Sequence, residues 1–324
     1  MRSAVIDGLG LSAALGLAAL PACGTSELEP IHAPPPSTAI DAGLEEILPV
    51  GLDAGPELAA DADAGAIAID SSACKRGMAA NDGPTAALAP SASAPGVAWW
   101  YNWAAQSPGG DARVAFVPMI WGGQSLNQPV PKGSRYLLGF NEPDFKSQSN
   151  LPSQQAAGYW PMVEAKALAA GVPVVSPGVQ FCTSAAGASQ CSDPAVTDPY
   201  TYLRDFFAAC AGCTVDYIAV HAYECDLPSL RAYLEGGTDA GGPQGFGQFG
   251  KPIWITELAC DASHTVAEQK AYMQAVVPYL ESSETVFRYA WFNAKNIPNA
   301  QLTNADGSLT DLGTTYIGLA AACR

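Results

Sequence analysis

Positive charge is scarce in this sequence. The chain of 324 residues has 15 lysine and arginine residues against 31 acidic residues, and its formal net charge is −16. Nucleic-acid binding needs a basic face that pairs with phosphates, so this balance excludes nucleic acid as the main partner. A neutral polymer such as a glycan remains compatible with the composition.

One stretch lacks lysine, arginine and aromatic residues altogether. Residues 24–73 hold ten acids, whereas residues 74–324 hold 14 basic and 20 acidic residues. Alanine, proline and glycine are frequent in the acidic stretch, and its like charges repel one another. We therefore expect residues 24–73 to be a disordered linker. A pro-segment or low-complexity filler is the alternative.

A hydrophobic run long enough to span a bilayer is also lacking at the N-terminus. The apolar run at residues 9–20 is shorter than the ~20 residues that a membrane helix needs. The sequence LPAC at residues 20–23 resembles the lipobox of a bacterial lipoprotein. We therefore expect residues 1–23 to be an export signal and Cys23 to be lipidated, with a plain cleaved signal peptide as the alternative. The expected location is the cell surface, the outer membrane or the medium.

Nine cysteines suit an exported protein that forms disulfides. If Cys23 carries a lipid, an even number remains. Short separations favour two of the pairs, and a third pair brackets the globular region, which leaves the last two cysteines for each other. The expected pairs are Cys182–Cys191, Cys210–Cys213, Cys74–Cys323 and Cys225–Cys260. A zinc site at CAGC (210–213) is the alternative, but no second pair at zinc-site spacing stands beside it.

Residues 74–324 contain eight short segments that are apolar in the middle and rich in β-branched or aromatic residues. Such segments are typical of strands that are buried on both faces. They cover residues 76–81, 97–103, 113–122, 136–144, 172–180, 215–223, 251–260 and 286–293. Helical patterns cover residues 153–170, 199–209 and 265–282, and the last opens with a possible capping box. This alternation predicts a parallel α/β fold, specifically a single (β/α)8 barrel.

Two of these segments end in a glutamate. LLGFNEPDF (137–145) carries Glu142, and PIWITELAC (252–260) carries Glu257. In a (β/α)8 barrel the carboxyl ends of all strands meet at one face, where the active site lies. Two facing carboxylates suit glycosidic bond cleavage, in which one acid protonates the leaving oxygen and one carboxylate attacks the anomeric carbon. This chemistry requires no metal and no cofactor.

Side chains beside the two glutamates fit the same chemistry. Asn141 is expected to bond the sugar 2-hydroxyl, and His221 or Tyr223 to orient Glu257. Further substrate-binding candidates at strand ends are Asn102, Trp103, Trp121 and Trp291. Taken singly, each of these residues is better explained by a role in the core, in a turn or at a solvated strand end. The prediction depends on their combination in a chain of barrel length.

The motifs LLGFNEPD, VDYIAVHAY, KPIWITELAC and FRYAWF resemble glycoside hydrolase family 128, the alkali-sensitive-linkage type of catalytic core. KRGMA and WWYNW near the start of the domain match the same pattern. The resemblance implies a retaining endo-β-1,3-glucanase with Glu142 as acid/base, Glu257 as nucleophile and Trp291 as the floor under a glucose ring. Residues 235–250 lie outside it and are expected to form a loop beside the cleft.

The resemblance implies a β-glucan polysaccharide or oligosaccharide as the partner. We expect a monomer that touches a membrane only through its N-terminal lipid. A β-glycanase of another linkage is one alternative. A surface glycan-binding barrel without turnover is another, which the presence of both carboxylates disfavours. A structural lipoprotein is a third, which the aromatic-rich strand ends disfavour.

Overall fold

The computed structural model describes residues 74–183, 187–238 and 240–321. The expected export signal, Cys23, the expected linker and Cys323 lie outside the described residues. Among the residues described, no helix is both long enough and apolar enough to cross a bilayer.

Each of the eight expected strand segments contains a strand, and the strand pairs are parallel. Six strands form a sheet in the order β3-β2-β1-β8-β7-β6, and β4 pairs with β5. Isolated parallel bridges join Met119 to Leu138 and Val175 to Tyr217, between the two sheets. The strands are β1 Arg76–Ala79, β2 Trp99–Tyr101, β3 Ala115–Phe116, β4 Leu137–Leu138, β5 Val174–Val175, β6 Ile218–Ala222, β7 Ile253–Leu258 and β8 Val286–Phe292. The domain is therefore a parallel α/β fold.

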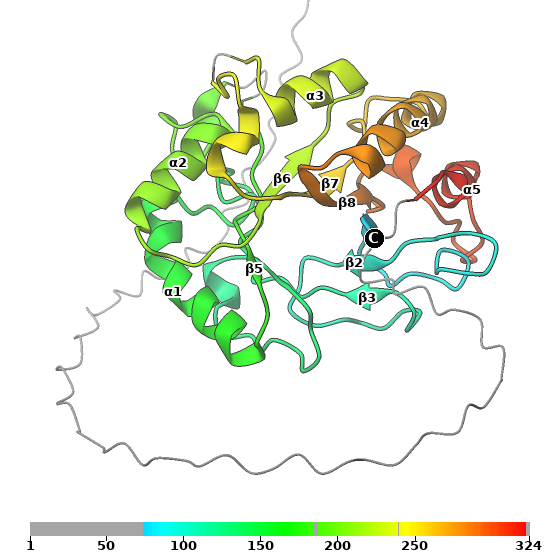
Figure 1. The fold of residues 1–324 in the computed structure, drawn as a ribbon, viewed down its shortest axis with the longest axis horizontal. Coiled ribbons are helices and arrows are strands. Elements are labelled where there is room, and N and C mark those ends of the chain that lie inside the picture. The colour runs from blue at the N-terminus through cyan, green and yellow to red at the C-terminus, as the bar shows by residue number, and fades with distance from the viewer. Residues whose placement is uncertain (1–73, 184–186, 239, 322–324) are drawn as a thin grey trace, which may run out of the picture. The chain divides into compact units, whose positions relative to one another are not determined.

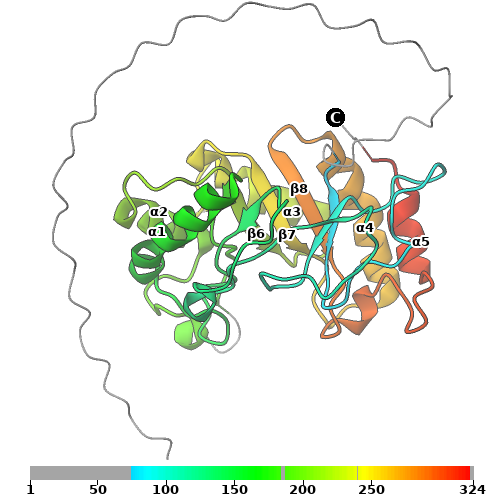
Figure 2. The ribbon, with the colours of Figure 1, turned by 90° about the horizontal axis from the view of Figure 1, so that it is seen from below.

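The helices lie outside the strands, with α1 and α2 on one side and α4 and α5 on the other (Figures 1 and 2). They are α1 Ser153–Ala170, α2 Pro199–Ala209, α3 Leu227–Glu235, α4 Val266–Ser282 and α5 Asp311–Gly318. Three of them fall where the sequence predicts helices. The short helices α3 and α5 are additional findings.

Local sequence explains where the helices begin. Asp198 caps α2 by accepting a hydrogen bond from the Thr201 amide at 2.8 Å, and Asp226 caps α3 in the same way. The expected capping box at the start of α4 is present, because Thr265 and Glu268 each accept the other's backbone N–H. These caps satisfy amide donors that a helix N-terminus otherwise leaves unpaired.

The strands form the centre of the core. Every residue of β6 and β7 is buried, as expected for strands covered on both faces. Trp99 and Trp254 meet edge to face there, with ring centroids 5.0 Å apart. Within 235–250, where a loop beside the cleft is expected, Gly245–Phe249 form a short 3-10 helix, and no described residue of this range lines the pocket that contains Glu142 and Glu257. Instead, Phe246 packs against Tyr200 with ring centroids 4.5 Å apart, because its apolar ring is fully buried between α2 and α3.

Candidate active site

A pocket of about 560 Å3 opens at the carboxyl ends of the strands, and both glutamates line it. Its aromatic walls come from Trp103, Trp121, Phe145, Tyr223 and Phe292. Its polar groups include Asn81, Asn141, Gln148, Gln180, Gln190 and Asp261. A pocket with flat apolar faces and several amides is suited to sugar rings, which present both C–H faces and hydroxyl groups.

Glu142 follows β4 and is held by its backbone and by two side chains. Its amide donates to the Gly178 carbonyl at 2.9 Å, which ties it to the segment after β5. Its Oε1 accepts a hydrogen bond from Gln180 and lies 2.9 Å from His221 Nδ1. Only 6% of Glu142 is exposed, at the pocket side.

Glu257 near the end of β7 is held by aromatic donors. Its Oε1 accepts from Trp103 Nε1 at 2.7 Å and from the Tyr101 hydroxyl at 3.3 Å. Its Oε2 accepts from the Tyr223 hydroxyl. Burial raises the pKa of Tyr101 and of Tyr223 well above the usual range, so both phenols stay protonated and donate.

His221 lies between the two carboxylates. The register of β6 and β7 pairs it with Glu257, and its Nδ1 is 2.9 Å from Glu142 Oε1 and 3.3 Å from Glu257 Oε2. Its Nε2 is buried without a hydrogen-bond partner among the described residues. Gly178 gives the ring room, because a Cβ at that position would lie 2.9 Å from Nε2. One imidazole thus connects both carboxylates.

Two of these groups, His221 and Glu257, hold a proton more tightly than they would in water. Burial lowers the pKa of His221, but the charges of Glu257 and Glu142 outweigh burial, and the pKa is raised. Burial raises the pKa of Glu257, partly opposed by His221 and reinforced by Glu142. Both directions favour retention of a proton on His221 or Glu257, as expected when an imidazole and two carboxylates are buried side by side.

Two residues of the site adopt backbone conformations that are unusual for residues other than glycine. Trp103 has φ 58° and Glu142 has φ 38°, both in the left-handed region. Such conformations cost about 1–3 kcal/mol each and are found where surrounding contacts fix them. Here, they aim an indole N–H and a carboxylate at the same cluster.

Asp144 holds Gln180 in place, and Gln180 in turn contacts Glu142. The Asp144 Oδ2 accepts a hydrogen bond from the backbone N–H of Gln180 at 3.3 Å, and the side-chain amide of Gln180 donates to Glu142. Burial, and then the charge of Glu142, raise the pKa of Asp144 well above its usual range. Asp144 is therefore more than a surface loop residue, since it is buried and holds Gln180, which contacts Glu142.

The structure brings most of the expected site residues together. Asn141, Trp103, Trp121 and Tyr223 line the pocket with both glutamates, and His221 lies buried beside them. The Asn141 Oδ1 is buried and has no hydrogen-bond donor among the described residues.

Two expected residues lie elsewhere. Trp291 is fully buried in the core, where its indole donates to the Ala300 carbonyl at 2.9 Å, so it cannot be the floor under a sugar. Successive strand residues point to opposite faces, and the next residue, Phe292, lines the pocket instead. Asn102 is used by its own loop, since it accepts from the Ala104 amide and donates to the Gln106 carbonyl.

Sequence reasoning did not include Tyr101, Gln180 and Phe292 among the site residues. Tyr101 belongs to the apolar run WWYNW and resembles a core residue, which it also is, with no exposed surface. Gln180 is the last residue of the fifth expected strand segment, and a polar residue at that position indicates a possible site residue. Phe292 packs 5.6 Å, centroid to centroid, from both Trp103 and Tyr223, the residues that hold Glu257.

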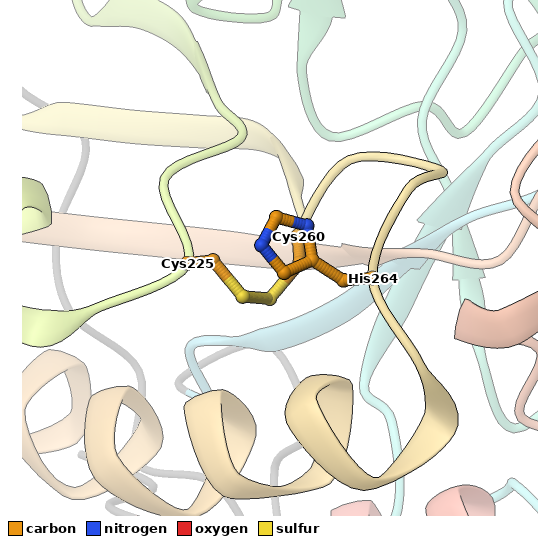
Figure 3. A group of neighbouring side chains, drawn as sticks. All are labelled: Cys225, Cys260 and His264. Carbon is orange, nitrogen blue, oxygen red and sulfur yellow. A yellow bond between two sulfur atoms is a disulfide. The ribbon is translucent and has the colours of Figure 1, made fainter.

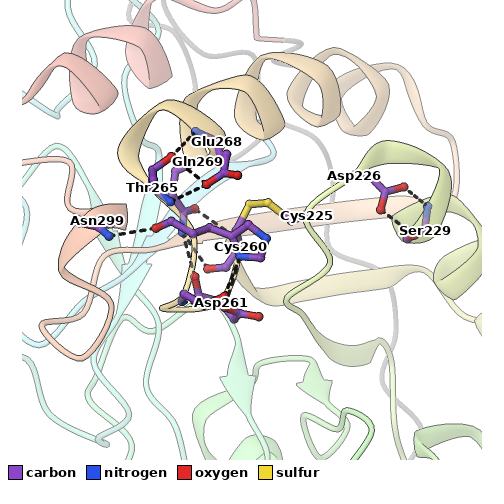
Figure 4. Close-up of a disulfide and its surroundings, with 11 residues drawn as sticks. Cys225, Asp226, Ser229, Cys260, Asp261, Thr265, Glu268, Gln269 and Asn299 are labelled. Carbon is purple, nitrogen blue, oxygen red and sulfur yellow. Dashed lines mark hydrogen bonds and ion pairs between the residues drawn. A yellow bond between two sulfur atoms is a disulfide. The ribbon is translucent and has the colours of Figure 1, made fainter.

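Three of the four expected disulfides are present: Cys182–Cys191, Cys210–Cys213 and Cys225–Cys260. The last one links the segment after β6 to the end of β7, next to Tyr223 and Glu257. His264 lies against this disulfide (Figure 3). Gln269 in α4 holds the Cys260 peptide at both its N–H and its carbonyl, at 3.0 and 2.9 Å (Figure 4). This framework fixes the wall of the pocket that carries Asp261.

Within the described part of the chain, two clusters have spacing that would suit a metal ion. Cys225, Cys260 and His264 form the first, but its two sulfur atoms are joined to each other. Glu142, His221 and Glu257 form the second, with one ligand atom from each within 4.8 Å of the others. Their oxygens already accept hydrogen bonds from protein donors, an environment that suits carboxylates acting as acid and nucleophile.

Comparisons with known proteins agree with this geometry. The model of the glycosyl hydrolase catalytic core family matches residues 77–316. The chain is 37% identical to a family 128 subgroup II endo-β-1,3-glucanase from Sorangium cellulosum, with a TM-score of 0.62, 75% of this chain covered and 98% of that one. It is 26% identical to a subgroup I endo-β-1,3-glucanase from Amycolatopsis mediterranei, solved with laminaritriose, with a TM-score of 0.57 and the same coverages.

A curated relative is Alkali-sensitive linkage protein 1 of Schizosaccharomyces pombe, 27% identical over 261 residues. That match covers 75% of this chain but only 44% of the relative, so this chain spans less than half of its length. The chain belongs to the glycosyl hydrolase catalytic core family and, within it, to glycoside hydrolase family 128. The resemblance found in the sequence motifs is thereby confirmed.

Proposed function

We propose that this protein hydrolyses β-1,3-glucan with retention of anomeric configuration. The observation that carries the proposal is the position of Glu142 and Glu257 on either side of the His221 ring. One carboxylate oxygen of each glutamate and one ring nitrogen of His221 all lie within 4.8 Å of one another. Retaining glycosidases hold their carboxyl groups about 5–5.5 Å apart, whereas inverting ones need about 6.5–9.5 Å for a water molecule. The family 128 relatives named above support glucan with β-1,3 linkage as the substrate.

In this mechanism Glu257 attacks the anomeric carbon and Glu142 protonates the oxygen that leaves. Tyr101, Trp103 and Tyr223 leave Glu257 one direction of approach, toward the pocket. Once Glu257 is bonded to the sugar, its negative charge is gone. Glu142 can then accept a proton from the water that releases the sugar. Asn141 bonds the 2-hydroxyl of the sugar being transferred.

We also propose that the two sheets form one closed (β/α)8 barrel. The isolated bridges from Met119 to Leu138 and from Val175 to Tyr217 support closure, because they connect β3 to β4 and β5 to β6 in parallel register. Pairing of β1 with β8 supports it too. Closure places β4 and β7 on one rim, which is the arrangement that two facing carboxylates require.

Endo action is proposed from the relatives, since both family 128 structures compared above are endo-acting. For the N-terminal part we propose a signal at residues 1–23, lipidation of Cys23 and a linker at 24–73 before the catalytic domain at 74–324. This proposal rests on sequence pattern alone. Mass spectrometry of the mature N-terminus tests it, because a diacylated cysteine and an unmodified cleaved end have different masses.

The test of function is release of reducing sugar from a soluble β-1,3-glucan, with a β-1,4-glucan as the linkage control. We expect release from the β-1,3-glucan only. Glu257→Gln removes the nucleophilic charge at constant shape and should lower kcat by about 10³-fold or more. Binding of the glucan without any release by the native protein would show a glycan-binding barrel instead.

A further inference from the structure

A second pocket adjoins the catalytic one, with a volume of about 590 Å3. This lies within the range of about 300–1,000 Å3 that is typical of small-molecule sites. The segment after β8 separates the two pockets. Ala294 and Asn296 line the catalytic pocket, while Asn293 and Lys295 line the second. The two pockets therefore lie on opposite sides of this segment.

The pockets meet at Asn81, which follows β1 and lines both of them. Its side chain is exposed and makes no hydrogen bond to any described residue. Thr303 in the second pocket is likewise without a side-chain partner in the described part of the chain. Met78 and Leu88 close the base of the pocket, although each is only 1% exposed. Free amide and hydroxyl groups over an apolar base match the hydroxyls and C–H groups of a sugar.

The charge of the second pocket favours an uncharged ligand. Its charged residues are Asp82 and Lys295, which form an ion pair at 3.1 Å and are both exposed. The pair neutralises itself and lies where water screens it. An anionic ligand therefore finds no unpaired cation in the pocket. A neutral polyhydroxyl ligand needs no such cation to bind.

The walls of the second pocket are fixed before any ligand arrives. Asn293 Oδ1 accepts from the Leu302 amide at 2.7 Å, and Gln301 donates to the Ala294 carbonyl at 2.7 Å. Thr85 donates to the Gly307 carbonyl at 3.2 Å, which joins the segment after β1 to the turn at 303–309. A preformed pocket binds with less loss of conformational freedom than one that must be ordered by its ligand.

We propose that the second pocket binds a distal glucosyl unit of a long glucan on the glycone side of the cleaved bond. This inference rests on the proposed function. The pocket lies beside β1 and β8, next to the strand that carries Glu257, whereas Glu142 follows β4. Since Glu142 protonates the leaving oxygen, the leaving part lies on its side of the cleft, and the glycone extends the other way. The pocket thus sets a preference for longer chains.

The test fills the second pocket with tryptophan. Ala305 and Thr303 line it and lie outside the catalytic pocket, so Ala305→Trp and Thr303→Trp occupy the pocket from its rim and from its wall. Ala112→Trp is the matched control, because it places the same side chain at an exposed alanine that lines neither pocket. Affinities for laminaritriose and laminarihexaose are measured by calorimetry on the full chain carrying Glu257→Gln.

Filling the pocket should weaken laminarihexaose binding about tenfold and change laminaritriose binding by less than about twofold, the effect of losing one sugar's hydrogen bonds. Unchanged hexaose affinity, or an equal loss for both ligands, would overturn the inference. If the native protein does not cleave β-1,3-glucan but filling still weakens hexaose binding, the hydrolytic function fails and the glycan subsite stands. If cleavage occurs and filling changes nothing, the subsite alone fails.

Discussion

The ring nitrogen of His221 is the point at which the two carboxylates meet. Its Nδ1 is within hydrogen-bonding distance of both Glu142 and Glu257, and the ring is fully buried. A buried imidazole in that position balances part of the negative charge that two close carboxylates accumulate. In the proposed mechanism it would help to stabilise the negative charge that Glu257 needs to attack the anomeric carbon.

Another acid, Glu224, is half-buried just beyond Tyr223 and does not line the catalytic pocket. Burial raises its pKa to about 7, and its Oε2 has no hydrogen-bond partner among the described residues. The folded protein thus keeps a proton that the unfolded chain releases above its ordinary pKa of 4.5. Between these two values the unfolded state binds fewer protons, so the free energy of unfolding falls as pH rises.

Glu224→Gln should abolish that part of the pH dependence. We expect the variant to be more stable than the native protein by roughly 2 kcal/mol above pH 7, after allowance for partial exposure, with little difference below pH 4.5. Urea unfolding across this pH range measures the effect. Glu284→Gln at an exposed position is the matched control. Parallel stability curves for Glu224→Gln and the native protein would contradict the account.

At the scale of elements, the Cys225–Cys260 disulfide ties the end of β6 to the end of β7 across 35 residues. Removing both sulfurs with Cys225→Ser and Cys260→Ser should lower the free energy of unfolding by about 3–4 kcal/mol, the loop-closure value for that length. Cys210 and Cys213 are only 3 residues apart, so the corresponding double variant should lose about 2 kcal/mol. Equal losses in urea unfolding would show that loop length is not the cause.

The strands and three of the helices were predictable because they repeat simple patterns. Short apolar segments fixed the eight strands, and the spacing of Thr265 and Glu268 predicted the start of α4. The short helices α3 and α5 were missed, since each spans few turns and carries little periodicity. The pairing of Glu142 with Glu257 followed from where strands end in a parallel fold.

The wrong prediction for β8 chose the correct strand but the wrong face of it. Trp291 and Phe292 are adjacent on β8, and a prediction that is off by one residue exchanges a core side chain for a cleft side chain. The left-handed conformations of Trp103 and Glu142 had no sequence signal, because neither is glycine. The role of Tyr101 was hidden for a related reason, since one side chain serves both the core and the site.

At the scale of the whole molecule, the site exists only when distant segments are folded together. Glu142 follows β4 in the two-stranded sheet and Glu257 lies in β7 of the six-stranded sheet, 115 residues further along the chain. The Trp103 donor comes from after β2, and His221 comes from β6. As a result, Glu142 and Glu257 are only 6% and 4% exposed, and both line the same pocket.

The most direct test of the central claim is the anomeric configuration of the first product. Proton NMR, recorded within the first minutes of β-1,3-glucan cleavage, distinguishes the new reducing end before it equilibrates. The separation of Glu142 and Glu257 across His221 predicts the β-anomer, because a glucosyl-enzyme on Glu257 inverts the centre twice. An initial α-anomer would contradict the account, since it requires a water molecule between the carboxylates and no covalent intermediate.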